Sequence, residues 1–248
     1  MRVTARCILR RLLAAVLATL LAGCPLRPGV PAPPPSAPQV PTPHAGVPYD
    51  IVADQSLLTV LVYRGGTLAS AGHNHVIASR SLEGTVYVPA DVLRASFEVR
   101  VPLATLTVDE AALRDRELSP DFPADVPESA RQGTRRNMLG ETLLDAGHYP
   151  QIVLRALGLE AQAAAGNAAL GANTVLARVE TTVRGQQRAL AVPVSYRLAA
   201  GALEVSAEFA LRQSDLGLTP FTALLGALAV QDEMRVRLQL LARPAGAR

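Results

Sequence analysis

The 248-residue sequence predicts an all-β fold, namely one antiparallel barrel or sandwich with one or two short helices behind a disordered tether. From residue 49 onward, apolar and polar residues alternate in several segments, as in strands with one dry and one wet face. Short turn signals join successive strands late in the chain. The first 48 residues carry no such pattern, which leaves about 200 residues, a length that suits one all-β domain.

Residues 1–23 are predicted to be a lipoprotein signal peptide. A basic start of 11 residues precedes an apolar run, LLAAVLATLLA, at residues 12–22. A helix of that length rises about 16 Å, roughly half of the hydrocarbon core, so it fits a signal peptide better than a membrane span. The run ends Leu21-Ala22-Gly23-Cys24, which resembles a bacterial lipobox. We therefore expect Cys24 to carry lipid (diacylglycerol, palmitate) as the mature N-terminus, the alternative being an ordinary signal peptide with a chance cysteine.

Residues 24–48 are predicted to be a lipidated, proline-rich linker. Ten prolines between residues 25 and 48 exclude a helix interior or a strand ladder. In a polyproline II conformation these residues could hold a domain up to about 70 Å from a membrane. Pro25 follows the cysteine, where an Asp marks inner-membrane retention in Gram-negative lipoproteins. By that resemblance we expect an outer-membrane lipoprotein in the bacterial cell envelope, facing the periplasm.

Charge and cysteine content exclude two classes of site. All 24 basic residues are Arg, and loss of the four in the signal peptide leaves 20 against 21 acidic residues. The mature chain then lacks the basic surplus of a nucleic-acid-binding protein. Cys7 and Cys24 are the two cysteines, so the domain has no disulfide and no thiolate metal site.

Alternating segments predict about nine strands. The clearest lie at residues 95–101, 174–183, 190–198, 203–211 and 235–240, with further strands expected at 49–53, 57–63, 83–89 and 151–159. Arg184-Gly185-Gln186 and Ala200-Gly201 are turn signals between late strands. Such a meander must close or stack to hide its edges. Pro193, inside a predicted strand, favours a strand edge or a bulge.

Two segments interrupt the strand pattern and predict helices. Residues 128–141 have a helix-like composition despite Gly133. Residues 219–230, TPFTALLGALAV, begin with Thr-Pro, a favourable N-cap and first helical residue. Because this second segment is apolar almost all round, we expect it to be buried or to form a lid over an apolar opening.

Three segments, in this order and spacing, resemble the YceI family of periplasmic proteins: SFEVRVPLATLTVD (96–109), RRNMLGETLLDAGHYPQIVLRA (135–156) and FALRQSDLGLTPF (209–221). The resemblance implies a lipocalin-like barrel over residues 49–243 that binds amphiphilic or polyisoprenoid molecules in an elongated apolar cavity. We accordingly expect an isoprenoid, quinone-like or lipid ligand, held for storage or transport. The smooth aliphatic inward faces fit such a ligand. They fit equally a structural domain whose inward side chains fill the barrel.

His73, Asn74 and His75 form a Gly-His-Asn-His cluster where many family members carry a lone histidine. On an extended strand the two histidines would share one face. Three interpretations stay open: a metal-dependent site, a polar cluster at the barrel mouth that binds a ligand head group, or a structural turn. The metal site would need further ligands, for which the candidates are Glu141, Asp145 and His148.

Arg135, Asn137 and Tyr149 are further candidates for contact with a ligand's polar end, since Arg binds anionic and carbonyl groups well. The alternative is a solvated helix face that caps one end of the barrel. The acidic residues between 109 and 128 lack calcium-loop spacing and are expected to be a solvated loop. With no catalytic or cofactor motif in the sequence, we expect a binding protein without a cofactor rather than an enzyme.

Overall fold

A computed structural model describes residues 44–162 and 173–246. Residues 43–248 form one compact unit. The predicted signal peptide, Cys24 and nearly all of the predicted linker lie outside the described residues. None of the helices in the described part is long and apolar enough to span a membrane.

Strands make up most of the described chain, and the predicted strands are confirmed. They are β1 (Val47–Ile51), β2 (Leu57–Gly65), β3 (His75–Ser79), β4 (Glu83–Val88), β5 (Ser96–Pro102), β6 (Thr107–Val108), β7 (Gln151–Ala161), β8 (Asn173–Val183), β9 (Gln186–Ala199), β10 (Ala202–Arg212), β11 (Thr222–Ala223) and β12 (Leu228–Pro244). The α-helices are α2 (Ala111–Arg114) and α3 (Glu128–Leu139), and six short 3-10 turns, η2–η7, join the strands.

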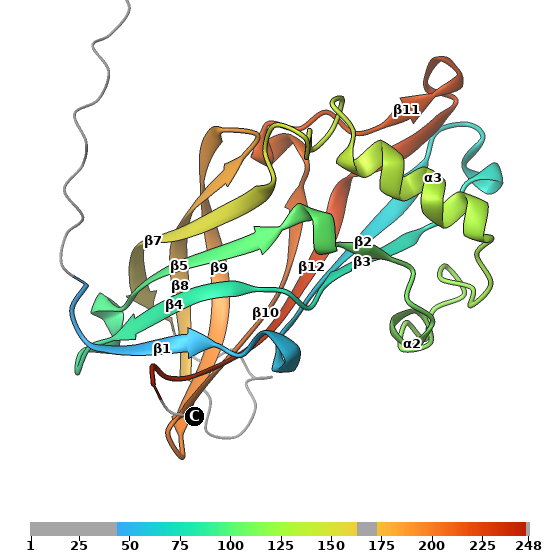
Figure 1. Ribbon diagram of the computed structural model, residues 1–248. Helices are drawn as coiled ribbons and strands as arrows, with labels where there is room; N and C mark the ends of the chain where they lie inside the picture. Colours follow the sequence, from blue (N-terminus) through green and yellow to red (C-terminus); the bar gives the residue numbers. More distant parts are fainter. Residues whose placement is uncertain (1–43, 163–172, 247–248) are drawn as a thin grey trace, which may run out of the picture. The chain divides into compact units, whose positions relative to one another are not determined.

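Eight antiparallel strands close into a barrel, in the order β1-β4-β5-β7-β8-β9-β10-β12 and back to β1 (Figure 1). The long strand β12 takes part in two pairings on the same edge. Its end, at residues 242–244, pairs with β1, whereas residues 229–239 pair with β2. From β2 the sheet continues to β3 and β6. Closure pairs most of the strand edges that a meander of this length would otherwise leave exposed.

Both predicted late turns are confirmed. Arg184 and Gly185 join β8 to β9, and Ala200 and Gly201 join β9 to β10. All four residues have positive φ, between 49° and 73°, as the two central positions of a type I′ hairpin turn require. The twist of such a turn matches that of the strands it joins, so these two turns fix the register of β8, β9 and β10.

The alternation of apolar and polar residues does not predict strand β3, because both faces of this strand are buried. All five of its residues are buried. Ile77 faces the barrel interior, while Val76 and Ala78 pack against Leu113 and Phe122 from the chain that follows β6. A strand that is covered on both sides has no polar face, so its sequence shows no alternation.

The prediction of a helix at residues 219–230 is wrong. This segment forms β11, the short turn η7 (Leu224–Gly226) and the start of β12, which pair as a hairpin. Ala229 and Val230 also pair with β2, opposite Gly65 and Arg64. The sheet supplies hydrogen bonds to the backbone on both sides, which outweighs the local Thr-Pro signal for a helix. The other predicted helix, at 128–141, is confirmed as α3.

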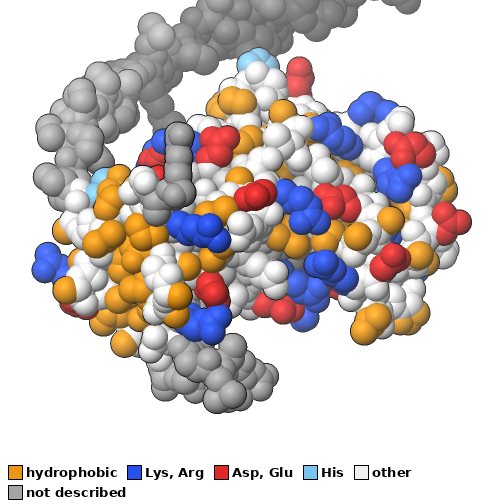
Figure 2. All heavy atoms as spheres, turned by 60° about the horizontal axis from the view of Figure 1, so that its bottom comes forward, with side chains coloured by type: hydrophobic (Ala, Val, Ile, Leu, Met, Phe, Trp, Pro, Cys, Tyr) orange, Lys and Arg blue, Asp and Glu red, His pale blue; other side chains and the backbone are white. Residues whose placement is uncertain are grey.

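The outer surface mixes charges of both signs. On the face in Figure 2, arginine and acidic side chains are interleaved over much of the surface, and hydrophobic side chains gather toward the left. Several charged side chains of the barrel form ion pairs across neighbouring strands, including Arg155–Glu98, Arg197–Glu204 and Arg235–Glu208. Each of these exposed ion pairs contributes little to stability, but together they make the outer face of the barrel polar and solvated.

Candidate functional site: an apolar barrel cavity

The interior of the barrel contains a cavity of about 340 Å³. Alternate residues of the strands line it, and nearly all of them are aliphatic. Thr181, Tyr196 and Gln213 are the polar residues among the described lining side chains. This volume lies within the range of small-molecule sites in proteins. The inward side chains therefore do not fill one another, and the structure contradicts the interpretation of a filled core.

Two clusters of buried side chains lie toward the two ends of the barrel. At one end, Met138 of α3 and Leu144 pack with Leu103, Leu216 and Met234. At the other end the cluster consists of Tyr49, Val88, Leu203, Leu240 and Ala242. Helix α3 thus lies over one end of the barrel, and its buried Met138 contributes directly to the cavity wall.

Between β9 and β10 the barrel wall is incompletely paired. The two strands pair over residues 195–199 and 202–206, next to the turn that joins them. Beyond Ser195 and Ser206 they are no longer paired with each other, although residues 186–196 of β9 pair with β8 and residues 203–212 of β10 pair with β12. The inward side chains Leu190 and Val192 of β9 are half-buried, whereas Ala177 and Val179 opposite them on β8 are fully buried. We call the stretch between residues 187–194 and 207–212 the β9–β10 gap.

Pro193 explains where the pairing stops. Opposed residues of an antiparallel ladder alternate between hydrogen-bonded and non-hydrogen-bonded pairs. The two-residue turn at 200–201 starts this alternation, so Ser195–Ser206 is a hydrogen-bonded pair and Pro193–Glu208 would be the next. Proline has no N–H to donate, and the ladder ends there. This confirms the expectation that Pro193 occupies a strand edge.

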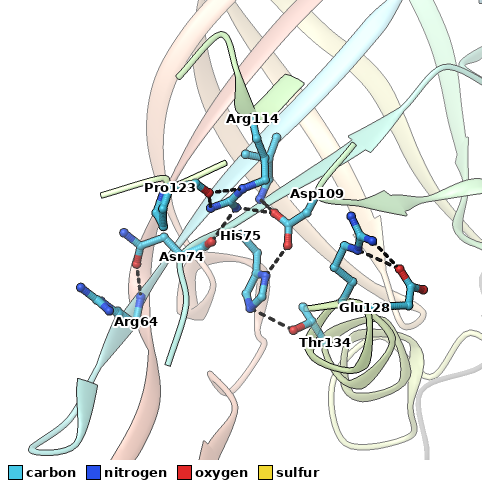
Figure 3. A network of polar contacts seen from close by, with 10 residues as sticks. Arg64, Asn74, His75, Asp109, Arg114, Pro123, Glu128 and Thr134 are labelled. Atoms are coloured by element: carbon cyan, nitrogen blue, oxygen red, sulfur yellow. Dashed lines mark hydrogen bonds and ion pairs between the residues drawn. The ribbon is translucent and has the colours of Figure 1, made fainter. Parts of the chain in front are cut away.

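A buried polar network lies between β3, the segment after β6, and α3 (Figure 3). The Asp109 carboxylate, 1% exposed, is at its centre. One oxygen lies 2.6 Å from His75 Nδ1, and the other accepts hydrogen bonds from an Arg114 guanidinium N–H at 2.6 Å and from the Val76 backbone N–H at 2.9 Å. Arg114 is itself 1% exposed, so this is a fully buried ion pair.

The remaining hydrogen bonds of the network connect Arg114 and Asn74 to residues of other segments. Arg114 donates from Nε to the Pro123 carbonyl at 2.9 Å and from a second guanidinium nitrogen to the Asn74 carbonyl, also at 2.9 Å. The Asn74 side chain accepts from the Arg64 backbone N–H and donates to the Asp121 carbonyl. Because every member binds partners from other segments, the network holds the chain between β6 and α3 against β3.

Asp109 stays ionised because of these contacts. Burial opposes ionisation of the carboxyl group, but hydrogen bonds from His75, Val76 and Arg114 outweigh it. The pKa of Asp109 is therefore below its ordinary value. At neutral pH the group is a carboxylate that neutralises the buried Arg114.

His75 connects the network to helix α3. Its Nε2 lies 3.0 Å from the hydroxyl oxygen of Thr134 on α3. The order Thr134–His75–Asp109 has the hydrogen-bonding pattern of a nucleophile, base and orienting acid. Here, however, Asp109 is also committed to Arg114, and the histidine is only 8% exposed. The arrangement fits a structural connection between β3 and α3.

A family of known proteins matches the part of the chain that forms the barrel. The profile of the YceI-like domain matches residues 49–242. The chain belongs to the YceI-like family. No curated protein matches the chain.

The solved structures to which this YceI-like protein is similar are distant from it in sequence. BcnA of Burkholderia cenocepacia has a TM-score of 0.53 and 14% identity, over 77% of this chain and 99% of that one. A polyisoprenoid binding domain from Saccharophagus degradans gives 0.48 and 12%, over 80% and 99%. The YceI protein of Campylobacter jejuni gives 0.43 and 10%, over 66% and 81%. At these identities the likeness concerns the fold alone.

In this YceI-like barrel, the residues singled out from the sequence lie outside the cavity lining. Asn74 and His75 are buried in the polar network, and His73 is half-buried with its ring 6.1 Å from that of His75, centre to centre. Arg135 donates to the Ala104 carbonyl at 2.6 Å. Asn137 is exposed, as is Tyr149, which lies against Gly185. Contact with a ligand's polar end stays a prediction for these six residues.

The geometry does not support a metal site at the histidines. Within residues 44–162 and 173–246 there is no group of three or more His, Cys, Asp or Glu side chains that could hold a metal ion. The proposed extra ligands Asp145 and His148 instead pair with each other at 2.8 Å near the surface. The hydrogen bond that His148 donates to the Asp145 carboxylate raises the pKa of His148 above its ordinary value.

The sequence analysis missed Asp109, Arg114 and Thr134. Asp109 was assigned to a solvated acidic loop, and this is wrong because the carboxylate is buried against Arg114 and His75. The one local signal is that Arg114, the last residue of the short helix α2, lies five residues after Asp109. Their partners on β3 are more than 30 residues away in sequence, so no local pattern reveals them.

Proposed function

We propose that this YceI-like barrel binds an apolar or amphiphilic molecule, such as an isoprenoid, a quinone-like compound or a lipid, for storage or transport. The observation that carries the proposal is the cavity of about 340 Å³ with its aliphatic lining. Burial of apolar surface is favourable by about 25 cal/mol per Å² and needs no directional contact. Such a lining suits a long aliphatic tail, whose conformation can adapt to the cavity.

The β9–β10 gap is the access route that we propose for this ligand. Where neighbouring strands of the wall are paired, an opening would break backbone hydrogen bonds. Between residues 187–194 and 207–212 those hydrogen bonds are not formed. Leu190, Val192 and Phe209, which line the cavity, come from the two sides of the gap and offer an apolar path inward.

We further propose that the protein works as a lipoprotein of the cell envelope. The support is the sequence alone: the apolar run, the Leu-Ala-Gly-Cys motif and the proline-rich segment up to residue 48. Acyl chains on Cys24 would anchor the barrel to the membrane, where apolar ligands are concentrated. Pro25 at the second mature position favours the outer membrane, with the domain facing the periplasm.

Two alanines of β10 provide a matched test of the cavity. Ala207 faces inward and lines the cavity, whereas Ala210 is on the exposed outer face of the same strand. A polarity-sensitive probe with an aliphatic tail, such as parinaric acid, should bind the wild-type protein and the Ala210→Phe variant alike. Ala207→Phe should bind it at least tenfold more weakly, because the ring occupies the space of the tail. Equal binding by both variants would remove the cavity as the binding site.

A further inference from the structure

A hairpin at one end of the barrel presents leucine side chains to solvent. Between β11 and β12, the turn η7 contains Leu224, 68% exposed, and Leu225, which is fully exposed. In Figure 1 this hairpin projects at the top right, beyond the body of the barrel. Leu68 on the neighbouring loop is 45% exposed, and its N–H donates to the Ala227 carbonyl at 2.8 Å. We call Leu68, Leu224 and Leu225 the apolar tip.

The backbone conformation of the tip is unusual for leucine. Leu224, Leu225 and Gly226 have φ of 52°, 57° and 87°, so two leucines occupy the left-handed region that ordinarily takes Gly, Asn or Asp. A polar residue would suit this turn better, both for its conformation and for its exposure to water. Exposed apolar groups held in an unfavourable conformation point to a role at the surface.

The segment around the tip is uncharged. From Leu216 to Gln231 there are 16 residues without Asp, Glu, Arg or His, although both flanking positions, Asp215 and Asp232, are acidic. No aromatic residue stands among the three members of the tip. Protein-binding surfaces are enriched in Trp, Tyr and Arg, whereas aliphatic side chains on a protruding loop are suited to the acyl region of a lipid layer.

We propose that the apolar tip inserts into the surface of a lipid bilayer and docks the barrel there. The position of the tip fits the proposed function, on which this part of the argument rests. The chain runs from β10, one side of the β9–β10 gap, through η6 (Ser214–Leu216) directly into the hairpin. The proposed anchor at Cys24 would keep a bilayer within about 70 Å, so lipid is the apolar surface that the tip meets most often.

The test uses residues 44–248, which contain all three buried clusters of the barrel, so that binding does not depend on the anchor. Vesicles of phosphatidylethanolamine and phosphatidylglycerol are sedimented with the protein. We expect the double variant Leu224→Ser/Leu225→Ser to bind at least tenfold more weakly than the unchanged chain, because two leucines no longer enter the acyl region. Leu118→Ser is the matched control, since Leu118 is 97% exposed on a different loop, and it should bind as the unchanged chain does.

A second measurement reports insertion directly. The chain has no Trp, so Leu225→Trp and Leu118→Trp each introduce a single fluorophore. With vesicles, emission from Leu225→Trp should shift to shorter wavelength and be quenched by brominated acyl chains. Emission from Leu118→Trp should stay as it is in buffer.

Three outcomes would overturn the proposal: equal vesicle binding by the double serine variant, unshifted emission from Leu225→Trp, or a change from dimer to monomer in the serine variant without lipid. The last outcome would assign the tip to a second copy of this chain. Thermal unfolding of each variant verifies that the barrel is intact.

Failure of the cavity to bind a probe would remove the carrier role and leave vesicle binding unaffected, so the two proposals fail separately.

Discussion

His75 and Asp109 are joined by a contact of 2.6 Å between Nδ1 and Oδ2, with the carboxylate fully buried. Through this contact a strand of the sheet, β3, is connected to the chain that leads into α3. The histidine then reaches Thr134 on α3 itself. The polar network thus determines where the helix that closes the cavity lies.

Replacement of Asp109 by Asn should destabilise the barrel strongly. The change leaves the guanidinium of Arg114, 1% exposed, without its counter-charge. Removal of one partner of a buried pair costs about 3–5 kcal/mol. The loss is measured as the change in the free energy of unfolding in urea. Glu110→Gln is the control, since Glu110 pairs with the exposed Arg80 and should cost less than about 1 kcal/mol. A small effect of Asp109→Asn, equal to that control, would show that the network is not a stabilising element.

The same carboxylate predicts how stability depends on pH. Because the pKa of Asp109 is lower in the folded than in the unfolded protein, the carboxylate favours folding at every pH above its unfolded value. That contribution is lost as the pH falls below about 4, toward the lowered folded value. The difference in unfolding free energy between the wild type and Asp109→Asn should therefore be constant near neutrality and shrink in acid. A difference that grows on acidification would contradict this assignment.

Thr134 tests whether the network positions α3. In Thr134→Val the hydroxyl contact with His75 is absent and the shape is retained, which should cost about 1 kcal/mol. Amide hydrogen exchange in residues 128–139 should become faster, because the helix then opens more readily. Thr134→Ser keeps the hydroxyl and should exchange at close to the wild-type rate. Unchanged protection in the valine variant would mean that apolar packing of Met138 alone holds the helix.

The strands were predictable from sequence because each has one wet and one dry face. Residues 174–183 and 203–211, for example, alternate along almost their whole length and became β8 and β10. β3 lacks this signal, since its neighbours cover both faces. Residues 219–230 carry a true helix-start signal, but pairing with β2 and with the rest of the hairpin overrides it. A local sequence pattern indicates the intrinsic preference of a segment, but it does not indicate which strand the segment will pair with.

The candidate site was predictable only in part. Inward aliphatic residues such as Val179 and Leu190 fit a hollow barrel and a filled one equally well, and the volume between them depends on how far apart opposite strands stand. The family resemblance favoured the hollow barrel. The histidine cluster at 73–75 was noticed, but its partners Asp109 and Arg114 come from residues 34 to 40 positions away. Such contacts become visible only once the register of the sheet is known.

Cross-linking across the β9–β10 gap should slow ligand exchange. Ala191 and Ala210 are exposed on the two strands where they are not paired. When both are replaced by Cys in residues 44–248 and joined by a short bismaleimide, the rate of probe uptake should fall at least tenfold, because the strands can no longer move apart. Uptake is followed by stopped-flow fluorescence of parinaric acid.

Ser195 and Ser206 provide the matched control for this cross-link. They face each other on the same two strands in the paired part of the wall. A link between cysteines at these positions joins strands that are already held together, so uptake should proceed at the unmodified rate. If both links slow uptake equally, or neither does, the ligand enters by another route.

Native mass spectrometry of the protein, purified without detergent, tests the central claim most directly. We expect a fraction of the wild type to carry one additional apolar molecule, which organic solvent extracts and which chromatography identifies. The same mass should be present in Ala210→Phe and absent from Ala207→Phe, where the ring occupies the cavity. A wild-type protein that carries no such molecule, and also takes up none from a bacterial lipid extract, would contradict the account.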